Sequence, residues 1–296
     1  MQGLFKLDSF IVEKIWGSKR LAELKNLPSN DHIGETYEVS THASGNSKIN
    51  EEELSKYIQL NYLIKFISTS DNLSIQVHPD DEYARVHENE SGKTECWIIL
   101  DAKPGAGIYL GFKKGVTKKE FKNAIISGLP IQNFLNFIPV KKGEFYVLPA
   151  GMVHALGSDI TLCEIQQSSG VTYRVWDWDR VDDQGNSREL HIDQALDVLN
   201  FSDAFNKKYG SAIKENVFES DFVTSLLKHA EFETTLINAS RGKHEFNLED
   251  GESIIILEGE MEIDGTLYQS YESLIALGKQ NISIELESKT SFLLTK

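Results

Sequence analysis

The chain has 296 residues, of which 40% are hydrophobic and 25% are charged, and its formal net charge at pH 7 is −15. This composition is typical of a globular protein, and the length predicts two domains rather than one. The acidic balance argues against binding to nucleic acid or to anionic membranes, whose phosphates need a basic partner. It does not exclude a phosphorylated small molecule, because a few cations in a pocket can outweigh the global field.

Cysteine usage and hydropathy indicate a cytoplasmic protein. The two cysteines, Cys96 and Cys163, form no disulfide framework, which favours a reducing compartment. Residues 1–8 lack the apolar stretch of a signal peptide, and no later run approaches the ~20 apolar residues of a membrane helix. We expect a soluble, cytoplasmic monomer or homodimer with neither nucleic-acid nor membrane partners.

Short strands dominate the predicted elements of the first two thirds of the chain. Runs rich in β-branched and aromatic residues, bounded by Asp, Asn and Gly, favour strands. These runs cover residues 62–67, 73–78, 96–100, 145–148, 160–165 and 173–176. Many short strands separated by turns predict a sandwich or a barrel.

Helices are expected as insertions between the strands. Thr117 and Glu120 have the spacing of a capping box, so a helix begins there and ends near Gly128. A second helix is predicted over residues 193–199 from its apolar stripe. His87 is expected in an exposed polar loop. Residues 200–216 have no clean period and are expected to connect the two domains.

Strand signals resume near residue 218. Residues 253–265 predict a strand, a turn and a second strand, and residues 271–277 predict a further strand. We therefore predict one domain over residues 1–205 and a smaller β-domain over residues 206–296. His229 and His244 have no ligand-spaced partner and are expected to be structural.

Four residues from three separate strands have the character of metal ligands. Gln76 and His78 are two residues apart, so their side chains point to the same face of a strand. Glu95 and His154 come from later segments and complete a nitrogen and oxygen set suited to zinc or a similar divalent ion. No cysteine takes part, which favours a catalytic site over a thiolate-bound structural zinc.

The motifs around these residues resemble a known family. The spacing Gly143-x5-Pro149-x-Gly151-x2-His154 matches the second signature of the cupin superfamily. Gln76-x-His78 replaces the usual H-x-H pair of the first signature, and Glu95 follows His78 by seventeen residues. Together with G-K-T-E at 92–95 and Y-R-V-W-D-W-D-R at 173–180, this pattern resembles the type I mannose-6-phosphate isomerases in their short bacterial form.

The resemblance implies a mainly β fold with two cupin-like jelly-roll domains and a few inserted helices. The first domain would bind the metal and carry catalysis, and the second would have no metal site. Gln76, His78, Glu95 and His154 would hold one zinc per chain, with other divalent metals able to substitute.

The same resemblance implies roles for the residues around the metal. Lys93 and Arg174 would be pocket cations, and Glu164 an inward carboxylate beside the substrate; all three are predicted to be catalytic. Ser74, Lys93 and Arg174 are the candidates for substrate binding. Arg174 could instead be an ion-pair partner of a nearby aspartate, Asp177 or Asp179. The family often has an aspartate four residues before the arginine, where this chain has Gly170, so the general base is not carried over.

The implied reaction is the interconversion of mannose 6-phosphate and fructose 6-phosphate through an enediol. A proton leaves C2 and a proton returns to C1, with a small phosphosugar as the substrate. One alternative is a double-cupin sugar-binding or regulatory protein that holds a metal without turnover. Another is an iron-dependent dioxygenase, although such enzymes favour histidine-rich ligand sets.

Overall fold

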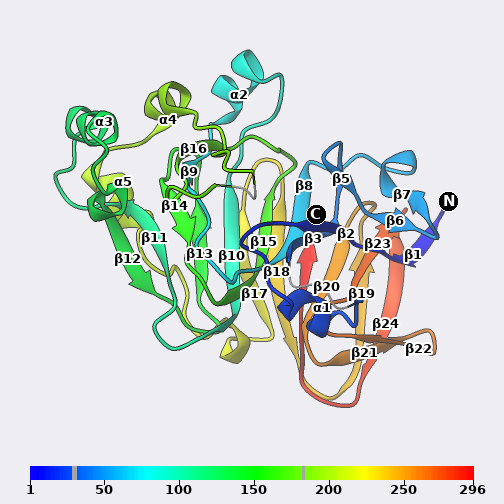
Figure 1. The fold of residues 1–296 in the computed structure, drawn as a ribbon. Helices are drawn as coiled ribbons and strands as arrows, with labels where there is room; N and C mark the ends of the chain where they lie inside the picture. Colours follow the sequence, from blue (N-terminus) through cyan, green and yellow to red (C-terminus); the bar gives the residue numbers. More distant parts are fainter. Residues whose placement is uncertain (29–31, 182–183) are drawn as a thin grey trace. The chain divides into compact units, whose positions relative to one another are not determined.

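Strands make up most of the regular structure, which confirms the predicted mainly β fold (Figure 1). The computed structural model describes residues 1–28, 32–181 and 184–296. The chain forms two compact units, which we call unit 1 (residues 1–67, 163–168 and 215–296) and unit 2 (residues 68–162 and 169–214). No helix in these described ranges is long and apolar enough to cross a membrane.

The make-up of unit 1 follows from a pairing between the two ends of the chain. Strand β1 (Gly3–Lys6) lies antiparallel to β23 (Ser273–Leu277), with Phe5 opposite Ile275. The N-terminal segment therefore belongs with the C-terminal strands, a long-range pairing that no local sequence pattern reports. The expected division into residues 1–205 and 206–296 differs from these units and stays a prediction about independently folding domains.

Two facing antiparallel sheets form the C-terminal part of unit 1. The first has the strand order β1-β23-β20-β25-β18-β17, and the second has the order β19-β24-β21-β22. Side chains from both sheets fill the space between them, including Ile254 and Phe292 from the first and Met261 and Ile284 from the second. Their strands are β17 (Val223–Lys228), β18 (Glu233–Ala239), β19 (Gly242–Leu248), β20 (Ser253–Glu258), β21 (Glu260–Ile263), β22 (Thr266–Gln269), β24 (Gln280–Leu286) and β25 (Thr290–Thr295).

The remainder of unit 1 is built from the N-terminal strands and part of β15 (Ile160–Gln167). The strand order is β15-β8-β3-β2, and helix α1 (Arg20–Leu24) contacts β3. The strands are β2 (Phe10–Glu13), β3 (Ile33–Val39), β8 (Tyr62–Ser68) and the short β4 (Thr41–His42), β5 (Gly45–Asn46), β6 (Lys48–Ile49) and β7 (Glu52–Glu53). Two single 3₁₀ turns, η1 (Leu54–Lys56) and η3 (Val217–Glu219), complete the unit.

Unit 2 contains a five-stranded antiparallel sheet of order β12-β11-β14-β9-β16 and the antiparallel pair β10 and β13. The strands are β9 (Ile75–Val77), β10 (Glu95–Ala102), β11 (Gly107–Phe112), β12 (Leu135–Pro139), β13 (Phe145–Leu148), β14 (His154–Leu156) and β16 (Tyr173–Trp176). Most of these strands were predicted, and β13 and β16 have the predicted bounds.

Helices cover one face of this five-stranded sheet. Phe121 and Ala124 of α3 (Lys118–Ile126) and Leu196 of α4 (Ile192–Val198) pack on the alternate strand residues Ile75 and Val77. In Figure 1, α4 lies beside β9 and β16, with which it is in contact. Because strand side chains alternate between faces, the residues between the buried ones point to the opposite face. The predicted capping box of α3 is present.

Two short helices correct the expectations for loops. His87 is exposed as predicted, but it ends helix α2 (Asp81–His87), which begins where the Asp80 side chain accepts a hydrogen bond from Tyr83 N. Helix α5 (Asp203–Tyr209) lies within the region expected to be a connection, and Ser202 caps it. Local capping makes these helices, whereas a single turn or two is too short for a recognisable apolar period. Unit 2 also contains the 3₁₀ turn η2 (Ile131–Phe134).

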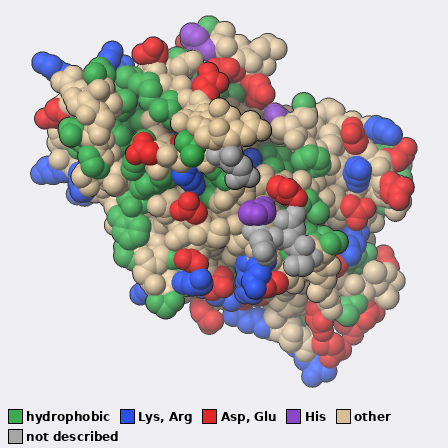
Figure 2. Space-filling model, viewed as in Figure 1, with side chains coloured by type: hydrophobic (Ala, Val, Ile, Leu, Met, Phe, Trp, Pro, Cys, Tyr) green, Lys and Arg blue, Asp and Glu red, His purple; other side chains and the backbone are tan. Residues whose placement is uncertain are grey.

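Acidic and basic side chains are intermixed over the face drawn in Figure 2. This face therefore presents both negative and positive side chains to solvent, despite the acidic excess of the sequence.

Candidate metal centre

A row of three polar side chains crosses the sheet of unit 2. Gln76 on β9 lies opposite His154 on β14 and opposite Arg174 on β16. Residues paired across neighbouring strands point to the same face. Since Ile75 and Val77 pack under the helices, the row points to the other face.

Two further segments of unit 2 add side chains to this row. His78 follows Gln76 by two residues, and Glu95 begins β10 two residues after Lys93. His78 lies just past the end of β9 and Lys93 just before β10, so neither predicted pair shares one strand, and side-chain contacts bring these residues together instead. His78, Glu95 and His154 each offer a ligand atom, and these three atoms lie within 4.8 Å of one another.

The three ligand atoms face one another at close range. His78 Nε2 lies 3.4 Å from Glu95 Oε2, and His154 Nε2 lies 3.3 Å from Glu95 Oε1. All three side chains are buried, with exposed fractions of 1–2%. Burial of a carboxylate is costly unless a positive charge or hydrogen bonds compensate it.

The hydrogen bonds on the far side of each imidazole identify its tautomer. His78 Nδ1 lies 2.8 Å from the Val171 carbonyl oxygen, and His154 Nδ1 lies 2.9 Å from that of Met152. A carbonyl oxygen can only accept, so each Nδ1 carries a proton and each Nε2 faces Glu95, where it can bind a metal once the ring is neutral. This is the usual orientation of metal-binding histidines, and the residues fit a divalent cation.

Glycines shape the turns that carry these ligands. Gly151 has φ = 85°, which glycine adopts without steric cost, and its N–H donates to the His78 carbonyl oxygen at 2.9 Å. A Cβ on Gly92 would lie 2.5 Å from the backbone of Asp80 and Asp81. The P-A-G turn and the G-K-T-E segment therefore need these glycines to hold the site together.

Gln76 and Ser74 form one hydrogen-bonded unit. Ser74 Oγ donates to Gln76 Oε1 at 3.2 Å, and Gln76 Nε2 lies 3.3 Å from His154 Nε2. The Gln76 amide thus lies beside the three ligand atoms with its nitrogen toward His154, and its oxygen, which accepts from Ser74, is the atom that would have to turn to the metal as a fourth ligand. Ser74 is buried and supports Gln76, while its predicted contact with substrate stays a prediction.

Lys93 lies against the metal ligands rather than in solvent. Its Nζ is 3.1 Å from Glu95 Oε2 and 3.3 Å from His78 Nε2, and the residue is 6% exposed. Lys93 and Glu95 are therefore in direct contact, and a shared substrate cavity stays a prediction.

Arg174 has hydrogen-bonding capacity to spare. Its Nη1 donates to the Glu189 carbonyl oxygen at 2.8 Å, whereas its buried Nε has no hydrogen-bond partner among the described residues. Burial and the nearby Arg188 lower the pKa of the Arg174 guanidinium from its ordinary value. A half-buried cation with an unused buried donor is suited to an anionic ligand.

The alternative role of Arg174 as an aspartate partner is not observed. Asp177 accepts hydrogen bonds from Arg180 Nη2 at 2.6 Å and from Arg188 Nε at 2.7 Å. Burial raises the pKa of Asp177, but the hydrogen bonds from the two arginines outweigh it, so this pKa is lowered overall. Asp179 accepts from Trp176 Nε1 at 3.0 Å.

Glu164 belongs to unit 1, not to the unit that holds the other predicted site residues. Its Oε1 lies 3.4 Å from Lys65 Nζ, and Lys65 Nζ lies 3.5 Å from Glu35 Oε2. All three side chains are buried. The sequence analysis identified Glu164 but not its ionic partners. Charged residues within the apolar strands at positions 35 and 65 are the sequence feature that could have indicated this network.

Known proteins resemble this chain in sequence. The mannose-6-phosphate isomerase of Streptococcus mutans is 41% identical over 213 residues, which are 65% of this chain and 66% of that protein. A probable mannose-6-phosphate isomerase of Bacillus subtilis, GmuF, is 39% identical over 216 residues, 65% of this chain and 67% of that protein. The chain belongs to the mannose-6-phosphate isomerase family. No protein-family model matches it.

Solved structures of mannose-6-phosphate isomerases agree with this assignment. The enzyme from Bacillus subtilis superposes with a TM-score of 0.83 at 25% identity, over 100% of both chains. Another, bound with zinc and yttrium, has a TM-score of 0.72 at 16% identity over 99% of both chains, and so shares the fold. The predicted family and fold class are confirmed, and the isomerase interpretation is favoured over a metal-holding binding module.

The sequence matches to the curated mannose-6-phosphate isomerases span about two thirds of their length. These matches identify the family of the chain; its own activity and substrate are proposed below.

His78→Ala and His154→Ala should each release the metal while leaving the protein folded. Apolar packing, such as that of Ile75, Val77 and Phe121, holds the sheet without the metal. Metal content and circular dichroism on the same preparations check this expectation. His244→Ala is the control, because His244 Nε2 contacts only the Ser240 carbonyl oxygen in unit 1 and should keep full metal. Unfolded His78 or His154 variants would contradict it.

Proposed function

We propose that this chain interconverts mannose 6-phosphate and fructose 6-phosphate with one divalent metal per chain, zinc in the first place. The observation that carries the proposal is the convergence of two imidazole lone pairs and the Glu95 carboxylate. Gln76 would supply the fourth ligand. The zinc-bound isomerase of the same fold supports the choice of metal, and cobalt or manganese suit the same nitrogen and oxygen set.

The metal, when bound, supplies Lewis-acid polarisation of the substrate oxygens. The ligand set contains no thiolate, which favours a catalytic over a structural centre, and a substrate oxygen would bind as a fifth ligand. The conversion of the aldose into the ketose requires no external oxidant. The electrons of the C2–H bond move into the enediol and then into the new C1–H bond.

Arg174 is proposed to stabilise the negative charge that develops on the enediolate. It lies in the cross-strand row with Gln76 and His154, so its guanidinium belongs to the same face of the sheet. Its buried Nε has no hydrogen-bond partner among the described residues and is therefore free to donate to an anion. A permanent cation held in a partly buried position stabilises developing charge with little reorganisation.

Lys93 is proposed to take part in proton transfer. A base removes the proton from C2, the C1=C2 enediol forms, and a proton returns to C1. The contact of Lys93 Nζ with Glu95 and His78 supports a role at the reacting carbons, beside the ligands. The phosphorus atom on O6 lies six bonds from C2, so the same ammonium is poorly suited to clamp it. Glu164 remains the other candidate for this proton transfer.

Substrate binding is proposed to involve Ser74, Lys93 and Arg174, with a small phosphosugar as the only partner. A monomer or homodimer in the cytoplasm stays our prediction for the assembly and location of the chain.

Purified, metal-loaded protein should form fructose 6-phosphate from mannose 6-phosphate in a coupled assay. His154→Ala measured at the same concentration is the control and should have no activity, because it lacks a ligand. Absence of product from fully metal-loaded wild-type protein would favour the binding-module alternative.

Arg174→Ala should lower kcat on the order of 10² to 10³, with a much smaller rise in KM, because its interaction strengthens as charge develops. Arg174→Lys should recover only part of kcat, since an ammonium lacks the planar fork. Steady-state kinetics on both variants measures this split. A sharp rise in KM at unchanged kcat would instead identify Arg174 as the phosphate clamp.

A further inference from the structure

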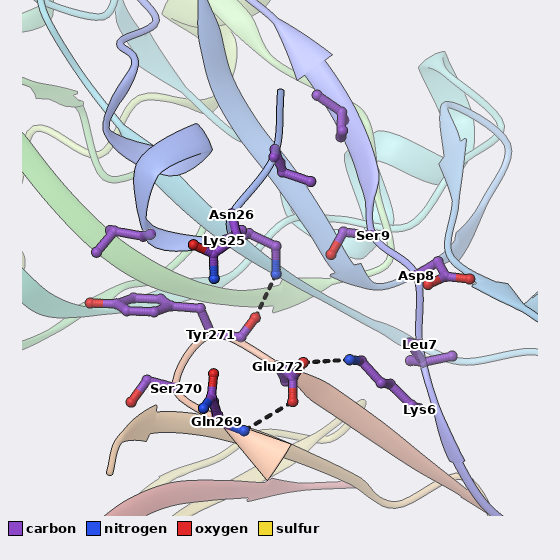
Figure 3. A pocket seen from close by; sticks show the side chains of 13 residues that line it. Lys6, Leu7, Asp8, Ser9, Lys25, Asn26, Gln269, Ser270, Tyr271 and Glu272 are labelled. Carbon is purple, nitrogen blue, oxygen red and sulfur yellow. Dashed lines mark hydrogen bonds and ion pairs between the residues drawn. The ribbon is translucent and has the colours of Figure 1, made fainter. Parts of the chain in front are cut away.

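Unit 1 contains a polar pocket that shares no residue with the metal centre. Its cavity of about 260 Å³ lies where residues 6–11, residues 24–27 and residues 269–272 meet (Figure 3). At ~30 Å³ for each water, this volume has room for roughly nine waters, or for one molecule of hexose size. The three segments come from opposite ends of unit 1 in sequence.

The lysines of this pocket are already neutralised. Lys6 Nζ pairs with Glu272, and Lys25 Nζ lies 2.8 Å from Glu38 Oε2, whose residue is fully buried. Lys25 also donates to the Tyr271 carbonyl oxygen, as Figure 3 shows. No ammonium is therefore left to balance an anionic ligand, and Asp8 adds a further negative charge.

Other polar side chains of the pocket have free hydrogen-bonding capacity. Within the described chain, the Asp8 carboxylate and the side-chain amides of Asn26 and Gln269 make no hydrogen bond or ion pair. These side chains provide both hydrogen-bond acceptors and amide donors, and Leu24 and Leu27 form an apolar part of the pocket wall. This mixture matches hydroxyl groups, which both donate and accept, together with the C–H surface of a carbohydrate.

Two residues that line the pocket have left-handed backbones. Asn26 has φ = 52° and Tyr271 has φ = 70°, which is unusual for a bulky side chain. The Tyr271 N–H donates to the Ile256 carbonyl oxygen at 2.7 Å, and the Tyr271 ring packs edge-on against Phe66 with centroids 5.2 Å apart. These contacts fix the turn, so this wall of the pocket is formed before any ligand arrives.

We propose that this pocket binds a neutral polyhydroxy compound of hexose or hexitol size. Phosphorylated sugars are disfavoured because both lysines are paired. A metal ion is disfavoured because Lys6 already holds Glu272, which leaves Asp8 as the one unpaired carboxylate among the described lining residues. The site adds a binding function to unit 1 that does not depend on isomerase activity.

D-Mannitol is a suitable probe because it has no carbonyl group and no phosphate, so the isomerase reaction cannot consume it. Titration of the full-length, ¹⁵N-labelled, metal-loaded protein should produce saturable amide shifts at residues 25–27 and 269–272. We expect a Kd on the order of millimolar, as for a ligand of this size. Shifts confined to other residues, or no saturable shift at millimolar mannitol, would overturn the proposal.

Two substitutions test the recognition groups. Asn26→Gly keeps the left-handed backbone and removes the amide, and Gln269→Ala truncates an exposed side chain. Each should raise the mannitol Kd by about tenfold or less, the effect of losing one hydrogen bond, and the double variant by more. Asn50→Gly is the matched control: Asn50 is exposed with φ = 49° but does not line the pocket, and its variant should bind like wild type.

Inorganic phosphate distinguishes the class of ligand. It should leave the amides of residues 25–27 and 269–272 unshifted, because the pocket has no unpaired cation. Stronger shifts at these amides with phosphate than with mannitol would contradict a neutral ligand. Unchanged mannitol affinity in the double variant would exclude Asn26 and Gln269 as the recognition groups and overturn the proposal.

Discussion

The close approach of three potential metal ligands is the constraint on which the site depends. His78 Nε2 and His154 Nε2 lie 3.4 and 3.3 Å from the Glu95 carboxylate in a buried space. A buried carboxylate needs positive charge beside it, and Lys93 Nζ, 3.1 Å from Glu95, is one source that a bound cation would add to. The backbone carbonyls behind the rings and the glycine turns hold the three ligand atoms at this distance.

The same sheet that carries the ligands extends the site toward a substrate. The register of β14, β9 and β16 puts His154, Gln76 and Arg174 side by side, so a group bound at the metal position would have a guanidinium on the same face. The opposite face of these strands is apolar and covered by helices. Because side chains alternate along these strands, one face of the sheet packs against helices and the other carries the metal ligands and Arg174.

Local sequence patterns predicted much of this arrangement. The two-residue spacings of Gln76 with His78 and of Lys93 with Glu95 pointed to residues that converge, although His78 and Lys93 lie just outside the strands, and the capping box at Thr117 marked α3. Partners that are backbone groups carry no sequence signal: the carbonyl of Glu189 holds Arg174, and those of Val171 and Met152 orient the histidines.

Long-range pairing was equally hidden from the sequence. Nothing in β1 indicates that it joins β23, which lies more than 260 residues away, and this pairing decides the composition of unit 1. The polar pocket of unit 1 depends on the same convergence, since its walls come from both ends of the chain. Family resemblance gave the ligand set, but it could not reveal a pocket formed by residues outside the shared motifs.

Anomalous X-ray diffraction from crystals of the zinc-loaded protein tests the central claim most directly. Data collected on either side of the zinc absorption edge should give one anomalous peak per chain, bonded to His78 Nε2, His154 Nε2 and a Glu95 oxygen at ~2.0–2.2 Å, with the Gln76 side chain as a further oxygen ligand. A peak elsewhere, or a peak beside Cys96 or Cys163 with these four residues unliganded, would contradict the account.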